Sequence, residues 1–568
     1  MDNVDKLAKA QEQEAEQEEK KTQSQIIVGL ASDMQFFYDE QGTSYARVKV
    51  HEHHEVWPIR TQDFKHILTI RYLNLSKDKD KAPGSQAMED ALRVLEAKSK
   101  IYGKQEKVHV RVAELEDKIY VDLCNESWQA IEINKKGWRV VDDPPVYFKR
   151  SKIMQPLPTP TPDGVIENLK PFINYDNDYD YKLIIAYLLS TFKENNPFPI
   201  LTIQGEQGSG KSNMTKVLRA LIDPSSLPLR ALPKEEKDLS IAANNTWILA
   251  FDNLSGLSNQ MSDALAKVST GGGLATRKLY TDDEEAVFQI MRPTILNGID
   301  DIGHRQDLLD RSIVLHLPSI EEKKRKDEKT FWKEFREIRP SILGALCTVA
   351  SQALNELPHT KLSSKPRMAD FALWITAAEK ALNWSKGEFM EIYTGNREKA
   401  IDQGLESDPF ASSVLELMKH ENKWIGNASQ LLGELSRFVD ERTKSSKAWP
   451  TSRSVRNRLR RINPALKKKD IIYVEYESRK NKTLRLEKVG EISSTTLPSS
   501  PKAINQHFEG YDNGYDNSNG YDISSLGYDD EKTSSPYKPH EINVSDDSYD
   551  NDDNFISNSK NDDEDLII

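Results

Sequence analysis

The sequence predicts a multidomain protein whose centre is an α/β core with a phosphate-binding loop. Three observations support this prediction. The chain has 568 residues, which is more than one hydrophobic core accommodates. Residues 205–212 form a glycine-rich motif between a strand-like and a helix-like segment. From about residue 490 onward the sequence is rich in Asp, Asn and Ser, and we expect a disordered acidic tail over residues 490–568.

Composition excludes several classes of protein. No apolar run is long enough to span a membrane, and the N-terminus lacks the apolar core of a signal peptide, so we expect a cytoplasmic protein without a membrane partner. Cys124 and Cys347 fit neither a disulfide framework nor a zinc ribbon. The net charge is −12, but the tail alone carries about −14, which leaves the rest slightly basic. That balance is compatible with a nucleic-acid partner.

The N-terminal third predicts a small accessory domain and a linker. Residues 1–25 are charged and have no apolar stripe, which indicates a solvated helix or disorder. Residues 26–150 predict an α+β domain, with a helix over 86–100 capped by Ser85 and a β-meander made of short alternating runs. The proline-rich residues 151–166 predict an extended linker.

The phosphate motif is the strongest signal in the chain. It matches G-x-x-x-x-G-K-[ST], with an apolar strand over 198–203 before it and a helix over 212–221 after it. We expect Lys211 to neutralise the β- and γ-phosphates of ATP, and Ser212 to hold Mg²⁺. The backbone and first helical turn would surround the phosphates. The predicted nucleotide-binding residues are Gly205, Gln207, Gly208, Ser209, Gly210, Lys211, Ser212 and Asn213.

A second strand over residues 246–253 predicts the metal-binding acid. It is apolar and ends in Asp252, as the Walker B strand of a P-loop ATPase does, and Asp252 would bind Mg²⁺ through water. Asn253 follows, where many such ATPases have a Glu that polarises the attacking water. An amide orients water but cannot accept its proton, so the catalytic base stays open, with Glu206 as a candidate.

Two further strands supply the remaining candidates for hydrolysis. The strand over 293–297 ends in Asn297, which we expect to position water near the γ-phosphate. Arg311 precedes the strand over 312–317 and is the first candidate for an arginine finger that reaches a neighbouring subunit, with Arg305 as the alternative. A surface ion pair is the competing interpretation of Arg311. A helical extension is expected over residues 319–407.

Residues 408–489 predict a winged-helix DNA-binding domain. Helices over 410–420 and 427–438 precede a basic helix, in which one face is apolar, and a hairpin with a basic tip follows. The basic helix would lie in a major groove and the hairpin on phosphate. The alternative is a solvated basic face that packs on the core. The candidate DNA contacts are Arg453, Arg456, Arg460 and Lys480.

In their order along the chain, these motifs resemble those of superfamily III helicases of the AAA+ class. The likeness is greatest to the ATPase half of phage and mobile-element primase-helicases and their primase-less relatives. Residues 269–280 look like the extra motif that builds a β-hairpin into the central pore. The resemblance implies an AAA+ core over residues 167–318, a homo-hexamer, single-stranded DNA in the pore and a collar-like role for residues 26–150. A primase, a polymerase or a single-strand-binding protein are candidate partners.

Arg277 and Lys278 are the candidate DNA contacts of the pore. We expect them to begin a strand that pairs with residues 286–291, and alternation sends the two side chains to opposite faces. One would then touch DNA, with Lys278 preferred. The tip over 281–285 is acidic, unlike the basic tips of viral helicases, so ion pairs with the tip are the alternative.

These observations lead to a function hypothesis with a rival. The first is an ATP-dependent DNA helicase or translocase in the replication of a phage, plasmid or integrated mobile element. The second is an AAA+ DNA-binding initiator or remodelling switch without processive unwinding, which Asn253 favours because an amide slows hydrolysis. The acidic tail ends in three apolar residues and resembles the partner-binding tip of single-strand-binding proteins, although a solubilising tail is the simpler interpretation.

Overall fold

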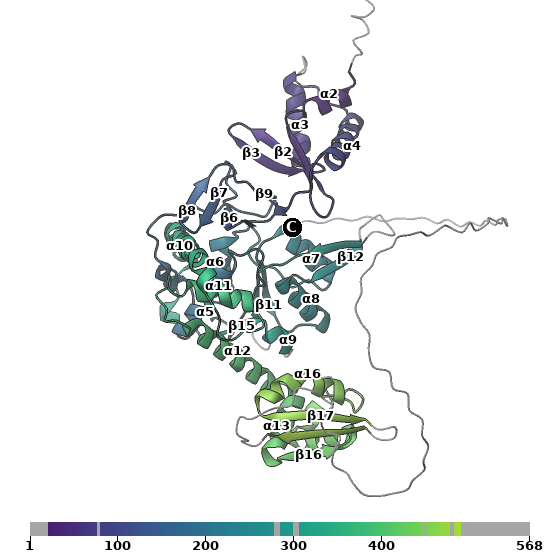
Figure 1. The fold of residues 1–568 in the computed structure, drawn as a ribbon, viewed down its shortest axis with the longest axis vertical. Coiled ribbons are helices and arrows are strands. Elements are labelled where there is room, and N and C mark those ends of the chain that lie inside the picture. The colour runs from purple at the N-terminus through teal and green to yellow at the C-terminus, as the bar shows by residue number, and fades with distance from the viewer. Residues whose placement is uncertain are drawn as a thin grey trace, which may run out of the picture. The chain divides into compact units, whose positions relative to one another are not determined.

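The computed structural model describes residues 21–75, 80–277, 285–298, 306–446, 449–477 and 482–489 (Figure 1). The chain divides into two units, Met1–Ile492 and Ser493–Ile568, and everything below concerns the first. The predictions for Lys278, Arg305, Lys480 and the acidic tail fall outside the described residues.

The first part of the chain has its own small core. Helices α2 (Gln23–Gly29), α3 (Gln62–Leu75) and α4 (Ser85–Tyr102) accompany an antiparallel sheet in the order β1-β2-β3. The strands are β1 (Gln35–Tyr38), β2 (Ser44–Val50) and β3 (His53–Pro58). The predicted helix over 86–100 is present, but Gly84 is its N-cap and Ser85 is already helical, because Gly84 holds the last extended backbone conformation.

The predicted β-meander is present as an antiparallel sheet in the order β5-β6-β7-β8. Its strands are β5 (Val112–Leu115), β6 (Lys118–Asp122), β7 (Ala130–Asn134) and β8 (Gly137–Val141); beside it, β4 (Val108–His109) pairs with β9 (Tyr147–Phe148). One face of the meander belongs to the same hydrophobic core as the central parallel sheet and its helices. Trp138 Nε1 also donates to Thr348 Oγ1 at 3.0 Å. The hydrophobic core is thus continuous across the predicted boundary at residue 150.

The proline-rich segment has no regular secondary structure over residues 155–161, and it is packed rather than free. Met154 and Leu157 are buried in the shared core. The segment also lies against helix α10 (Glu328–Glu356) at two glycines. A Cβ atom on Gly164 would lie 1.9 Å from Ser341 O, and one on Gly344 would lie 1.9 Å from Thr161 O. Only glycine permits this backbone approach at both positions.

The central sheet is parallel, with strand order β11-β14-β10-β15. Alternate residues of the sheet face two different clusters, so helices cover both faces. Leu201 and Ile203 pack in the cluster of α5, α6 and α10, whereas Ile200 and Leu296 pack in that of α7 and α8. The strands are β10 (Ile200–Gly205), β11 (Leu249–Leu254), β14 (Thr294–Gly298) and β15 (Ser312–Leu317); the helices are α5 (Asp178–Ser190), α6 (Lys211–Ile222), α7 (Glu236–Asn245), α8 (Asn259–Thr270) and α9 (Gln306–Leu309).

A helical region follows β15, as predicted. The 3-10 turn η2 (Glu322–Lys324) leads into α10, which η3 (Leu357–His359), α11 (Ala369–Ala378) and α12 (Glu388–Ser407) follow. Within the described part of the chain, no helix is long and apolar enough to cross a membrane.

The basic region after residue 408 has a separate core and a helix–strand–helix–helix–hairpin order. Its three-stranded sheet has the order β16-β18-β17, and β17 and β18 form the predicted hairpin. The predicted helices over 410–420 and 427–438 correspond to α13 and to α14 with η4. The elements are α13 (Pro409–His420), β16 (Lys423–Gly426), α14 (Ala428–Leu435), η4 (Ser436–Phe438), α15 (Glu441–Lys444), α16 (Val455–Lys468), β17 (Ile471–Glu477) and β18 (Lys482–Lys488).

Candidate nucleotide site and nucleic-acid surfaces

The candidate phosphate loop joins the carboxyl end of β10 to the first turn of α6. Gly208 and Gly210 have left-handed φ values of 85° and 82°, which side chains with a Cβ rarely adopt. Gly210 is the N-cap of α6, and Lys211 is its first residue. The free backbone N–H groups of this helix start and its positive dipole end favour an anion here.

Hydrogen bonds fix the shape of the loop. Lys211 Nζ donates to Gly205 O at 2.6 Å and to Glu206 O at 2.8 Å. Ser209 is fully buried, and its hydroxyl donates to Glu206 O at 2.8 Å. Asn174 Nδ2 donates to Ser209 O at 2.9 Å from outside the loop. Gln207 and Asn213 are exposed and Ser212 is half-buried at the loop's edge, where a ligand can reach them.

Asp252 and Asn297 meet at this edge of the sheet. Asn297 lies opposite Ile203 in the β10–β14 register, and its Nδ2 donates to Asp252 Oδ1 at 3.1 Å. Thr215, one turn after Lys211, places its Oγ1 at 2.8 Å from Asn297 Oδ1. Asn297 is completely buried. The chain of contacts from α6 to β14 and β11 thus joins the phosphate loop to the acid.

Asn253 and Glu206 bear on the open question of the base. Asn253 is exposed, and its backbone N–H donates to Asp252 Oδ1 at 2.9 Å. Its φ of 59° lies in the left-handed region, in which Asn is better tolerated than Glu. Glu206 Oε2 accepts a hydrogen bond from Ser319 Oγ at 2.8 Å. Glu206 stays the candidate base, because the Asn253 amide cannot accept a proton.

Arg311 lies at the amino ends of the strands, whereas the candidate phosphate loop of the same chain lies at their carboxyl ends. Its carbonyl accepts a hydrogen bond from the amide of Ile200, the first residue of β10, whereas the loop follows the last residue of that strand. The six residues of β10 separate the two by about 20 Å. Arg311 and the candidate phosphate loop of the same chain therefore lie at opposite ends of the strands, too far apart for the Arg311 side chain to reach the loop.

The expected β-hairpin is present, with a different start. Strand β12 (Gly273–Arg277) pairs antiparallel with β13 (Glu285–Gln289), and Arg277 lies opposite Glu285. Arg277 therefore ends its strand and does not begin it. The reason is that Gly271 closes α8 in a left-handed conformation, so the chain becomes extended directly afterwards. The side chain of Arg277 lies outside what the structure describes.

The base of the hairpin is anchored beside the chain that leads into β11 by Arg292. Its Nε donates to Ala243 O at 2.8 Å and to Thr246 O at 3.2 Å, and its guanidinium lies 5.2 Å from the Trp247 ring. Burial lowers the pKa of Arg292 to about 10. The sequence gave no signal for this contact, because the partners are backbone carbonyls about 45 residues away.

Helix α16 presents the candidate duplex-binding surface. Val455, Leu459 and Ile462 are buried, as its predicted apolar face requires. Arg453 is exposed just before the helix, and Arg456 is half-buried. Arg460 differs from expectation, since it makes two bonds of 2.7 Å to the Glu475 carboxylate.

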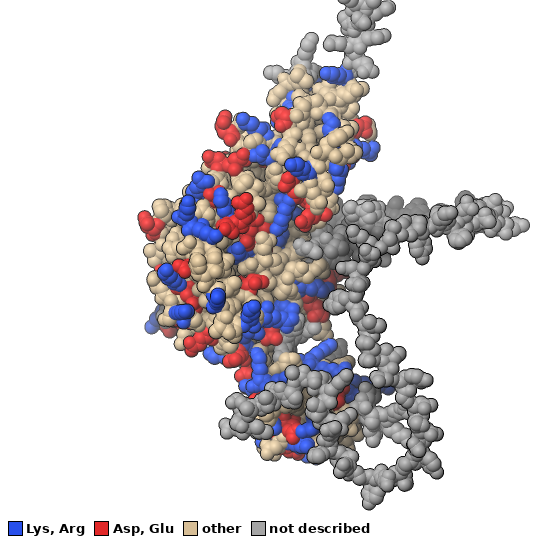
Figure 2. All heavy atoms as spheres, viewed as in Figure 1, with Lys and Arg blue, Asp and Glu red and all other residues tan. Residues whose placement is uncertain are grey.

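This ion pair also acts on Glu475. The Arg460 guanidinium lowers the pKa of that carboxyl. Arg460 is thus held within its own domain, whereas Arg453 and Arg456 are the better candidates for DNA. On the face shown in Figure 2, Lys and Arg side chains alternate with Asp and Glu.

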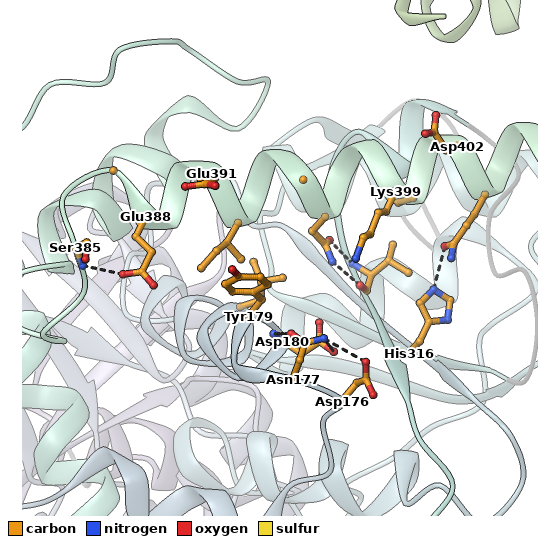
Figure 3. A pocket seen from close by; sticks show the side chains of 18 of the residues that line it. Asp176, Asn177, Tyr179, Asp180, His316, Ser385, Glu388, Glu391, Lys399 and Asp402 are labelled. Atoms are coloured by element: carbon orange, nitrogen blue, oxygen red, sulfur yellow. Dashed lines mark hydrogen bonds between the residues drawn. The ribbon is translucent and has the colours of Figure 1, made fainter.

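A cavity of about 950 Å³ lies beside the edge strand β15, and the sequence did not predict it. Figure 3 shows Asp176, Asn177 and Asp180 on one side and the helix that carries Glu388, Glu391 and Lys399 on the other, with His316 bonded to Gln403 at 3.0 Å. Burial raises the pKa of Asp180. Its full carboxylate lining is Asp176, Asp180, Glu388, Glu391, Asp402 and Glu406. No residue of the phosphate loop lines the cavity, and so many carboxylates would repel a phosphate.

Comparison with known proteins identifies the class. Two successive parts of the chain match replication proteins of mobile elements, so the protein is a replication protein of that kind. The model of the actinomycete integrative conjugative element replication protein family matches residues 166–386. The model of the RepA C-terminal domain of the same elements matches residues 410–502. The helicase class suggested by the motif order is not settled by these matches.

Solved structures and curated sequences add little. An apo structure of the NrS-1 C-terminal region is 13% identical to this chain, with a TM-score of 0.37, and the match covers 82% of this chain and 98% of that one. Another structure of the same region is 14% identical, with a TM-score of 0.34 and the same coverage. Scores at this level support no conclusion about mechanism. No curated protein sequence matches the chain.

Proposed function

We propose that this replication protein is an ATP-dependent DNA helicase or translocase with an AAA+ core of the superfamily III type. The observation that carries the proposal is the joined site at the carboxyl edge of the central sheet. There the loop that holds Lys211 is connected through Thr215 and Asn297 to Asp252. A phosphate loop, an acid and a water-positioning amide are the parts that hydrolysis of a nucleoside triphosphate requires.

Each residue of this site has a distinct role. Lys211 binds the β- and γ-phosphates, and the buried amide of Asn297 orients the attacking water. Ser212 and Asp252 offer a hydroxyl and a carboxylate, the hard oxygen donors that suit Mg²⁺. Bound there, Mg²⁺ would neutralise charge that develops on the phosphates. Arg311 of a neighbouring subunit would complete the site from across the interface, in a homo-hexamer.

The C-terminal region supports the DNA-binding part of the proposal. Its order of helices and strands is compatible with a winged helix, in which α16 would be the recognition helix and the β17–β18 hairpin the wing. In this arrangement the recognition helix enters the major groove, and the wing lies on phosphate. Duplex DNA would be held here, while single-stranded DNA would pass the β12–β13 hairpin in the pore.

Unwinding of a forked duplex by the full-length protein tests the proposal. We expect strand separation that requires ATP and Mg²⁺, and an ATPase rate that single-stranded DNA raises. Lys211→Ala should lose both activities while keeping its fold, because the side chain contacts loop carbonyls and not the core. Normal ATP hydrolysis by that variant would refute the motor.

A second candidate function is favoured by Asn253. An amide at this position cannot accept a proton, so slow hydrolysis would suit a switch that assembles on DNA and remodels it without processive unwinding. A protein that opens duplex DNA near its binding site when ATP is bound, but fails on long forked substrates, would support the switch over the helicase.

A further inference from the structure

The segment that follows β15, residues 318–325, lies against the phosphate loop; we call it the closing segment. Asn174 Nδ2 joins the two, since it donates to Pro318 O at 2.7 Å and to Ser209 O at 2.9 Å. Ser319 Oγ donates to Glu206 Oε2 at 2.8 Å. The closing segment is thus tied to the first half of the loop by side-chain hydrogen bonds.

Contacts at the loop glycines place the rest of the segment. A Cβ atom on Gly210 would lie 3.0 Å from Ile320 Cδ1, and one on Gly208 would lie 3.2 Å from Arg325 Nη2. The Arg325 guanidinium therefore lies directly beside the loop that is expected to hold phosphates. The glycine at position 208 leaves room for it, because a larger residue would crowd the guanidinium.

Charge and exposure suit this arginine for an anion. Lys326, the next residue, is paired with Glu334 at 2.7 Å, whereas no carboxylate among the described residues is paired with Arg325. Arg325 is exposed, and its backbone N–H donates to Glu322 O at 3.2 Å, which holds the 3-10 turn before it. A guanidinium presents a planar set of donors that matches phosphate oxygens in bidentate geometry.

We propose that Arg325 is a phosphate-binding residue that acts on the nucleotide of its own subunit. The inference rests on the proposed function and adds a second cation to the site, from a different element than Lys211. It also assigns different nucleotide sites to the two arginines. Arg325 contacts phosphate within one chain, while Arg311, at the opposite edge of the sheet, serves the neighbouring chain.

Titration of full-length protein with fluorescent ATP and with fluorescent AMP tests this role. Arg325→Ala should bind ATP about tenfold to a hundredfold more weakly, the loss expected for one charge-assisted contact. The affinity for AMP should change by less than about threefold, because AMP lacks the outer phosphates that Arg325 is expected to contact. The ATP affinity of Arg325→Lys should lie between that of the unmodified protein and that of Arg325→Ala. Arg336→Ala, an exposed arginine on α10, is the matched control and should bind as the unmodified protein does.

The outcomes separate this inference from the function on which it rests. If Lys211→Ala loses ATP binding but Arg325→Ala keeps it, the role of Arg325 is wrong and the nucleotide site stands. Equal losses for ATP and AMP would show that Arg325 shapes the loop and does not contact the outer phosphates. If neither variant affects ATP binding, both the inference and the nucleotide site are wrong.

Discussion

At the scale of single residues, backbone conformation explains an unusual residue type in the proposed site, the asparagine at position 253. In the proposed site, Asn253 stands where many P-loop ATPases have Glu, and its φ of 59° lies in the left-handed region. Asn adopts this conformation at little cost, whereas Glu pays about 1 kcal/mol or more. The side chain at this position is thus constrained by the turn after β11 as well as by chemistry. Replacing Asn253 by Glu would therefore change both the strain in the turn after β11 and the chemistry of the side chain.

Thr215 gives a cleaner test of the site at the same scale. Its hydroxyl lies 2.8 Å from Asn297 Oδ1, and the Asn297 amide in turn donates to Asp252. Thr215→Val should lower the ATPase kcat about tenfold, because the buried amide loses a partner and is free to turn. ATP affinity should change little. Thr215→Ser keeps the hydroxyl and should retain most of the rate, and equal rates for Val and Ser would remove the hydroxyl from the mechanism.

Arg311 leads to a prediction about pairs of subunits. Arg311→Ala should abolish turnover but keep ATP binding, because its own phosphate loop is about 20 Å away across the sheet. Mixing this variant with Lys211→Ala protein should restore part of the activity, since some interfaces then combine an intact loop with an intact arginine. The ATPase rate of mixtures at several ratios measures this. Mixtures that never exceed the sum of the two inactive proteins would place Arg311 in a structural role.

At the scale of elements, α16 shows how an ion pair changes which basic residues are available. The helical period groups Arg453, Arg456 and Arg460 on one side, but Glu475 on β17 binds Arg460 at 2.7 Å through two bonds. A pair that is partly exposed contributes little to stability, although it orients the guanidinium away from other ligands. The helix is therefore expected to contact DNA through its N-terminal end.

Binding of duplex DNA by α16 variants checks this expectation. The double variant Arg453→Ala/Arg456→Ala should weaken duplex binding and reduce the slope of log K against log salt by about 2, since two phosphate contacts are lost. Arg460→Ala should change the slope by much less. The binding constant at each salt concentration is measured by fluorescence anisotropy, over a range of about 50 to 200 mM salt. A larger effect of Arg460→Ala would show that its pair with Glu475 opens on DNA.

At the scale of the whole molecule, the β-meander and the proline-rich segment complete the core of the nucleotide module. Arg111 is fully buried, and its Nε donates to Asp223 Oδ1 at 3.1 Å, while its Nη1 and Nη2 donate to the carbonyls of Asp122 and Gln155 at 3.0 Å. Asp223 also accepts the backbone N–H groups of Trp247 and Ile248. This network joins the meander to the end of α6 and the approach to β11.

A truncation follows from this network. A fragment limited to residues 166–386 should be insoluble or melt far below the full chain, because it exposes the meander side of the shared core and leaves Asp223 buried without Arg111. A fragment of residues 106–489 should melt cooperatively. In the full chain, Arg111→Ala should lower the free energy of unfolding by about 3–5 kcal/mol, as the loss of one member of a buried pair does. A soluble, ATP-binding 166–386 fragment would contradict the shared core.

Local sequence patterns determined much of this protein. The phosphate loop, the apolar strands that end in Asp252 and Asn297, the meander, the hairpin and the amphipathic face of α16 all follow from periodicity and turn residues, which act over a few positions. The continuity of the hydrophobic core across residue 150 could not be predicted from the sequence. The pattern of one apolar face does not indicate which distant segment packs against it. The sequence also offered no sign that Gly84 caps α4 or that the hairpin strand already begins at Gly273, since boundaries depend on single backbone angles.

What only the tertiary structure decided is which side chains meet across long separations. Thr215 with Asn297, Arg292 with the carbonyls before β11, and Arg325 with Gly208 are each joined by folding and not by spacing. The same holds for Arg311, which the sequence marked by its place before a strand. The parallel order of the sheet decides that it lies at the edge away from its own phosphate loop. Sequence therefore determined the residue types of the candidate site, and the parallel direction of the strands determined which of them lie together, because parallel strands place all their carboxyl ends at one side of the sheet and all their amino ends at the other.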